Sequence, residues 1–266
     1  MIAIFLWTLR QRKWFTIWWC IGVVALIAML MAVYPSIHQQ ADELQKTISQ
    51  LPAAIRALKT SSADDAFSPI GYLNSQLYYA TLPLLFSILT INLGSGLLAK
   101  DEQAHTLELL LARPVSRTRV ILGKALAGVA IVVIVALTTL VTTLALAKVV
   151  DLDIAASKVA VATLYATLLP LSFGVIAFTF TAMGRFAKLA SIGVSTLFAF
   201  GGYLLSSLAG LSDWIEKPAQ LLPYHYYNPY NILHGTVSGT LTAYLLAIFA
   251  IGACVSWISF RRRDIE

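Results

Sequence analysis

The sequence is poor in charge: charged residues make up 12% of its 266 positions, whereas hydrophobic residues make up 58%. Ordinary soluble domains carry about 25% charged residues, and disordered chains contain few hydrophobic ones. The mean hydropathy of +0.77 agrees with this composition. Because so much apolar surface is not stable against water, the composition excludes both classes and predicts a membrane protein in contact with the lipid bilayer.

The sequence also lacks the motifs of several enzyme classes. It has no G-x-x-x-x-G-K-[ST] phosphate loop, no H-E-x-x-H motif and no G-x-S-x-G motif. Its two cysteines, Cys20 and Cys254, lie in separate apolar runs and provide neither a disulfide framework nor a metal site. His225 and His234 are too few to make a metal site without a cysteine or an acidic partner nearby. We therefore expect no catalytic residue, metal or other cofactor on this chain.

Six apolar runs are long enough to cross a membrane, since a helix of about 20 residues spans the hydrocarbon layer. Backbone polar groups in lipid must be paired within each segment, so each run is predicted to be a helix. The fold class is therefore all-α: a polytopic membrane protein with six transmembrane helices in a single transmembrane domain, residues 1–266. The predicted spans are Trp14–Tyr34, Leu77–Ala99, Val120–Ala147, Val159–Ala182, Leu189–Gly210 and Leu241–Phe260.

Lysine and arginine are distributed unevenly between the predicted loops. With the N-terminus inside, thirteen of the 19 basic residues and five of the 13 acidic residues face the cytoplasm, so the cytoplasmic side carries +8 and the other side −2. Basic residues favour the cytoplasmic side, and both termini are therefore predicted to lie there (N-in/C-in). The charge indicates topology rather than nucleic-acid binding. We expect a multi-pass protein of the cell membrane, of bacterial or archaeal type.

Three segments outside the spans have predicted structures of their own. Residues 1–13 combine apolar residues at helical spacing with a basic end, which indicates either an interfacial helix or an extension of the first span. Residues 35–76 form an external segment with an amphipathic helix. Residues 211–240, rich in proline and tyrosine, are predicted to form an external, re-entrant-like hairpin.

Small residues recur at every fourth position of the fifth span, at Gly202, Ser206 and Gly210. Such a stripe lets two helices approach closely in lipid. It predicts either a subunit contact or packing within the chain.

The charged loop at residues 100–119 is the most informative segment of the sequence. Asp101 is a suitable N-cap for a helix that begins at Glu102, and Arg113 precedes Pro114, where helical geometry is disfavoured. The segment between them predicts a short cytoplasmic helix with its leucines on one side. Such a helix fits a groove on a soluble partner. A helix lying flat on lipid is the alternative, which its acidic residues disfavour.

This loop resembles the region after the second span in membrane subunits of type-2 ABC exporters. The shared pattern is an acidic pair, then Thr-Leu-Glu, a leucine run, a proline followed by Ser-Arg, and Gly-Lys at the start of the third span. The matching residues are Glu102, Thr106, Leu107, Glu108, Leu110, Leu111, Pro114, Val115, Ser116, Arg117, Gly123 and Lys124. His105 departs from the pattern, which commonly has glycine there.

The resemblance implies a permease subunit that forms a homodimer, or pairs with a similar permease, and binds a separate ABC ATPase subunit that carries ATP and Mg. It places the ATPase-coupling residues in the charged loop: Glu102, Thr106, Leu107, Glu108, Leu110, Leu111, Arg113, Pro114 and Arg117. The expected function is ATP-driven export of a hydrophobic or amphipathic substrate, with the enzyme activity on the partner. An ion-coupled secondary transporter, or a non-transporting scaffold or sensor, is the alternative.

Overall fold

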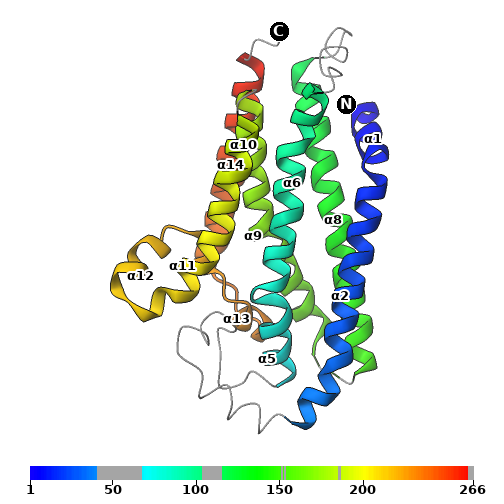
Figure 1. The fold of residues 1–266 in the computed structure, drawn as a ribbon, viewed down its shortest axis with the longest axis vertical. Helices are drawn as coiled ribbons and strands as arrows, with labels where there is room; N and C mark the ends of the chain where they lie inside the picture. The colour runs from blue at the N-terminus through cyan, green and yellow to red at the C-terminus, as the bar shows by residue number, and fades with distance from the viewer. Residues whose placement is uncertain (41–67, 104–115, 151, 153, 185–186, 263–266) are drawn as a thin grey trace.

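The computed structural model describes residues 1–40, 68–103, 116–150, 152, 154–184 and 187–262. These residues form a bundle of helices and contain no β-strand (Figure 1). The longer helices are α1 (Ile2–Gln11), α2 (Lys13–Gln39), α6 (Thr81–Gln103), α8 (Arg117–Val149), α9 (Ala156–Met183), α10 (Ala187–Thr196) and α14 (Gly239–Arg262). The shorter elements are α5 (Pro69–Leu73), η1 (Asn74–Tyr78), η2 (Leu197–Gly201), α11 (Gly202–Leu208), η3 (Ala209–Leu211), α12 (Asp213–Ala219), η4 (Pro223–Tyr226) and α13 (Pro229–His234).

Six helical segments of the described chain are long and apolar enough to cross a membrane, which confirms the predicted spans and the all-α class. They are Lys13–Ile37, Pro69–Gln103, Arg117–Val149, Ala156–Met183, Leu189–Leu211 and Gly239–Arg262. Both chain termini lie at the same end of the bundle, which we call the upper end after its place in Figure 1. An even number of spans requires this arrangement, while the side of the membrane that the upper end faces stays a prediction.

The second span begins earlier in the chain than its apolar run. The Ser68 hydroxyl caps α5 by accepting a hydrogen bond of 3.0 Å from the backbone N–H of Gly71. From α5 the chain passes through the π-helical turn η1 into α6. The Thr81 hydroxyl donates to the carbonyl of Gln76, 2.7 Å away, and so pairs a backbone group near this irregular turn.

The centre of the bundle is the pair α6 and α9, which make the most extensive contact between any two helices described. A Cβ atom placed on Gly174 would lie 2.7 Å from Cβ of Thr90, so only glycine permits this approach. The Thr90 hydroxyl donates to the carbonyl of Pro170 across the same contact, at 2.7 Å. This packing makes the second span the most buried of the six.

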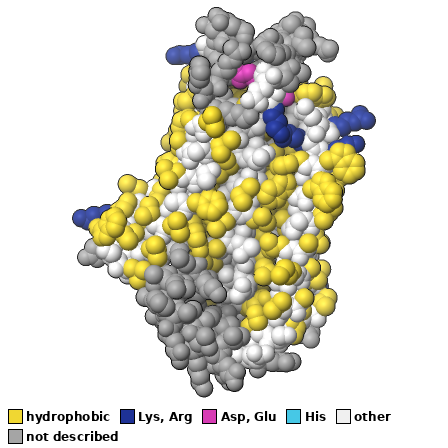
Figure 2. All heavy atoms as spheres, in the orientation of Figure 1, with side chains coloured by type: hydrophobic (Ala, Val, Ile, Leu, Met, Phe, Trp, Pro, Cys, Tyr) yellow, Lys and Arg dark blue, Asp and Glu magenta, His cyan; other side chains and the backbone are white. Residues whose placement is uncertain are grey.

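The remaining spans surround this pair. The first span, in α2, packs mainly on α8, and α14 packs mainly on α9. The first span is the least buried of the six within the described chain. The outer helices expose large apolar side chains along the flank, whereas most of the Lys and Arg side chains visible in Figure 2 lie near the upper end. This is the surface that a bilayer requires.

The three segments outside the spans are described to different extents. In the N-terminal segment, α1 is separated from α2 by one residue, Arg12, and packs on α8; its place in the membrane interface stays a prediction. Residues 41–67, which include the predicted external amphipathic helix, lie outside the described residues. In the hairpin at residues 211–240, the hydroxyl of Tyr227 donates to the carbonyl of Tyr78, 2.8 Å away, and so ties the hairpin to the second span.

Candidate functional site

The described residues that flank the predicted coupling loop, at the end of α6 and the start of α8, lie at the upper end of the bundle (Figure 1). Residues 104–115 lie outside the described chain, and with them seven of the predicted coupling residues: Thr106, Leu107, Glu108, Leu110, Leu111, Arg113 and Pro114. The structure describes the two roots of the loop. Glu102 is half-buried in the last turn of α6, and Arg117 is half-buried at the start of α8.

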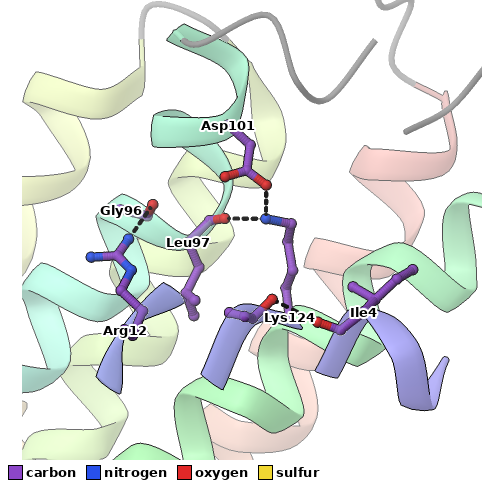
Figure 3. A network of polar contacts seen from close by, with 7 residues as sticks. Ile4, Arg12, Gly96, Leu97, Asp101 and Lys124 are labelled. Atoms are coloured by element: carbon purple, nitrogen blue, oxygen red, sulfur yellow. Dashed lines mark hydrogen bonds and ion pairs between the residues drawn. The ribbon is translucent and has the colours of Figure 1, made fainter. Parts of the chain in front are cut away.

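A buried ion pair joins these roots. Lys124 of α8 pairs with the carboxylate of Asp101 in α6, and its Nζ also donates to the carbonyl of Leu97 at 2.8 Å (Figure 3). The lysine is 1% exposed and the aspartate 4% exposed. Removing two charges from water is costly unless they meet each other and further partners, as they do here. The pair therefore fixes the end of α6 to the first turns of α8.

The neighbouring Gly123 explains how α1 reaches this pair. A Cβ atom at this glycine would lie 3.1 Å from Cγ2 of Ile4, so a side chain there would push α1 away. With α1 in place, Lys124 Nζ lies 5.9 Å from the ring centroid of Trp7. The Gly-Lys dipeptide thus has two structural roles. The glycine lets α1 pack closely on α8, and the lysine forms the ion pair with Asp101 of α6.

Arg12 adds a second buried cation from the junction of α1 and α2. Its Nη2 donates to the carbonyl of Gly96 at 2.9 Å, and the side chain is 8% exposed (Figure 3). Burial lowers the pKa of the Arg12 guanidinium from its ordinary value, and the nearby Asp101 carboxylate offsets part of this shift. Arginine remains protonated in proteins, so Arg12, Lys124 and Asp101 together carry a net charge of +1.

The start of α8 also contacts the end of α14. Arg117 Nη1 donates to the carbonyl of Arg261 at 3.3 Å, and Trp257 Nε1 donates to the hydroxyl of Thr118 at the same distance. The guanidinium of Arg261 lies 4.8 Å from the ring centroid of Trp257. The roots of the loop are therefore connected to α1, to the α1–α2 junction and to α14.

Comparison with known protein families identifies the chain. The family model described as ABC-2 family transporter protein matches residues 8–265, which is nearly the whole sequence. The chain belongs to the ABC-2 transporter family. No curated protein matches it. As a member of this family it is a membrane permease of the ABC type, and the resemblance identified in the charged loop is confirmed.

In this ABC-2 transporter protein, one prediction for the charged loop is wrong. Asp101 does not cap a helix that begins at Glu102, because α6 continues without a break through Gln103 and Asp101 lies inside it. Its carboxylate is bound by Lys124 instead. The sequence placed Asp101 in the loop and Lys124 at the start of the third span, and their pairing was not predicted. The sequence offered one signal for this ion pair: an acidic residue at the end of one apolar run and a lysine near the start of the next.

The three small residues of the fifth span, Gly202, Ser206 and Gly210, differ in what surrounds them. A Cβ atom on Gly202 would lie 3.3 Å from Cδ2 of Tyr224, so the hairpin of the same chain covers this position. The Ser206 hydroxyl oxygen is buried without a hydrogen-bond partner among the described residues, while Gly210 borders open space. A subunit contact along this stripe stays a prediction.

The two histidines of the hairpin contact tyrosine. His225 lies against the ring of Tyr226 at 5.1 Å between centroids, and Nδ1 of His234 lies 2.9 Å from the carbonyl of Tyr230. Among the residues that the structure describes, no three His, Cys, Asp or Glu side chains are grouped as a metal site requires.

Proposed function

We propose that the chain is the permease subunit of an ABC exporter, in which ATP hydrolysis on a separate subunit drives efflux of a hydrophobic or amphipathic substrate. The observation that carries the proposal is the buried ion pair between Asp101 and Lys124. Because it joins α6 and α8 directly at the roots of the charged loop, a force applied to the loop reaches both helices together. Membership of the ABC-2 transporter family supports the same assignment.

The coupling residues of this proposal are those of the charged loop, from Glu102 to Arg117. A partner ATPase that binds the loop from the cytoplasm would move it during closure on ATP. The hydrogen bond from Arg12 to Gly96 adds the start of α2 to the pair α6 and α8. These upper ends would then move as one rigid body, which is a common form of conformational switching.

Pairing with a second permease is supported by the exposed strip on α6. Ile88 and Asn92 lie one helical turn apart and are exposed, although most of this helix is buried. An amide that faces lipid has no hydrogen-bond partner, and this is unfavourable. We propose that a second chain, identical or similar, covers this strip and that the stripe at Gly202, Ser206 and Gly210 provides a further contact.

The ion-coupled transporter is the second candidate, because buried ionisable groups in spans often belong to ion pathways. The depth of Lys124 disfavours it. With 33 residues, α8 is about 50 Å long, and Lys124 lies about 10 Å from its start. The hydrocarbon layer is about 30 Å thick, so a centred helix places this lysine near the boundary rather than at mid-membrane.

Purification of the tagged full chain from its native membrane tests the proposal. We expect a phosphate-loop ATPase subunit to copurify with the chain. The double variant Glu102→Lys and Glu108→Lys should lower the recovery of this ATPase about tenfold, because reversing the charge of a side chain at an interface replaces attraction with repulsion. The matched control is Glu216→Lys on the exposed surface of α12, which should leave recovery unchanged.

Two results would contradict the exporter assignment. One is the absence of any ATPase from the purified material, together with undiminished efflux of a fluorescent amphipathic dye by the double variant. The other is dye transport that continues without ATP and follows an imposed ion gradient, which would favour the ion-coupled carrier.

A further inference from the structure

A groove of about 360 Å³ lies on the flank of the bundle between α2 and α6. Its walls include Phe15, Trp18, Trp19, Gly22 and Leu26 of α2 and Leu85 of α6. All of these are apolar, and the volume falls within the range of about 300–1,000 Å³ that is usual for small-molecule sites. The groove lies along a membrane span, where water is excluded, so its occupant must be apolar.

The length of the groove corresponds to one leaflet of the bilayer. From Phe15 to Leu26, α2 rises by about 16 Å at 1.5 Å per residue. Half of a hydrocarbon layer of about 30 Å is close to this value. An acyl chain that enters from the upper surface would therefore extend along the whole groove.

Gly22 keeps this space open. It is exposed, and a Cβ atom built on it would have no neighbour within 4 Å. The packing of α2 mainly on α8 leaves the surface towards α6 unfilled by the described chain. The groove is therefore a space for a separate molecule rather than a gap closed by a side chain.

A buried cation lies at the upper end of the groove. The guanidinium of Arg12 is 6.0 Å from the ring centroid of Phe15, the uppermost lining residue on α2. It has five N–H donors, and the described residues provide one acceptor, the carbonyl of Gly96. Together with Lys124 and Asp101 it leaves one positive charge uncompensated among these three side chains.

Aromatic side chains place this cation at the depth of lipid headgroups. Trp14 and Trp18 follow Arg12 on α2 and are 64% and 67% exposed. Tryptophan is enriched at the boundary between hydrocarbon and headgroups. Exposed Lys13, whose Nζ lies 5.7 Å from the ring centroid of Trp14, adds a second positive charge at this level. Figure 2 shows basic side chains in this upper region, above hydrophobic ones.

We propose that the groove between α2 and α6 holds one anionic phospholipid, with an acyl chain along the groove and its phosphate at Arg12. The apolar walls, the leaflet-long dimension and the uncompensated charge each match one part of such a lipid. A helix from a second copy fits less well, since it is about 10–12 Å across and would bring no negative charge to Arg12 by itself. The proposal requires only that the chain spans a membrane and does not rest on the exporter assignment.

Native mass spectrometry of the purified full chain tests this binding. Delipidated protein is titrated with palmitoyl-oleoyl phosphatidylglycerol or with phosphatidylcholine of the same acyl chains, and bound lipids are counted. We expect one high-affinity phosphatidylglycerol per chain, bound about tenfold more tightly than phosphatidylcholine. Arg12→Gln should abolish this preference. Gly22→Phe should lower phosphatidylglycerol affinity about tenfold by filling the groove.

The matched control is Gly193→Phe on α10, because Gly193 also borders open space on a membrane span. It should bind lipid as the unchanged chain does. A Cβ atom at position 22 has no neighbour within 4 Å, and Gly22→Phe leaves Arg12 and Lys13 unchanged, so this variant decides the matter even if Arg12→Gln misfolds. Equal affinity for the two lipids, or full phosphatidylglycerol binding by Gly22→Phe, would overturn the proposal. Loss of a dimer in Gly22→Phe with unchanged lipid binding would instead identify a second copy as the occupant.

Discussion

Replacing Lys124 with methionine tests the ion pair at the root of the charged loop most directly. Methionine keeps an unbranched side chain but removes the ammonium group, so the Leu97 carbonyl loses a donor and Asp101 stays buried without its counter-ion. Loss of one partner from a buried pair costs about 3–5 kcal/mol. We expect a loss of about 3 kcal/mol in the free energy of unfolding, at the lower end of this range, because Arg12 still attracts the Asp101 carboxylate.

The assay is the free energy of unfolding of the full chain in mixed micelles, measured by reversible titration with a denaturing detergent. The matched control is Lys148→Met in the last turn of the same helix, where the lysine is exposed and the change should stay within about 0.5 kcal/mol. Combining Lys124→Met with Asp101→Leu should recover most of the loss, because no buried carboxylate is then left without its counter-ion. The reasoning fails if Lys124→Met is as stable as the unchanged chain, or if the double variant loses the sum of both single effects.

Two further substitutions test the packing of the spans. Gly174→Ala should lower the free energy of unfolding by about 1–3 kcal/mol, because its methyl group would overlap Thr90. Gly193 borders open space, so the control Gly193→Ala should not destabilise the chain. Equal free energies of unfolding for the two variants would refute the close contact of α6 and α9. Tyr227→Phe removes the hydrogen bond to the Tyr78 carbonyl and should lower the free energy of unfolding, measured by the same detergent titration, by about 0.5–1.5 kcal/mol. An unchanged free energy of unfolding would show that this hydrogen bond does not hold the hairpin.

The six spans were predictable because lipid imposes a length and a composition on each of them. The fourth span, predicted at Val159–Ala182, is observed at Ala156–Met183, and the fifth agrees within one residue at each end. The second was predicted to begin at Leu77 but begins at Pro69. Its first residues include Asn74, which is buried, and Gln76, which is half-buried. A hydropathy average misses a helical turn whose polar residues pack against the rest of the protein.

The ion pair was not predictable by the same reasoning. Periodicity and capping rules act within about four residues, whereas Asp101 and Lys124 are 23 positions apart on separate helices. Asp101 also satisfies the local rule for an N-cap, and the local rule led to the wrong prediction. Only the packing of α6 on α8 brings the carboxylate and the ammonium together.

The central position of α6 has a consequence for biogenesis. The ribosome completes this helix second among the spans, yet its main packing partner, α9, is translated fourth, and the counter-ion of Asp101 belongs to the third. The glycine surface of α6 gains its close contact with α9, and Asp101 its counter-ion, only when these later helices arrive. The packing of α6 is therefore completed only after the fourth span has been made, so the first half of the membrane domain depends on the second half for its final place.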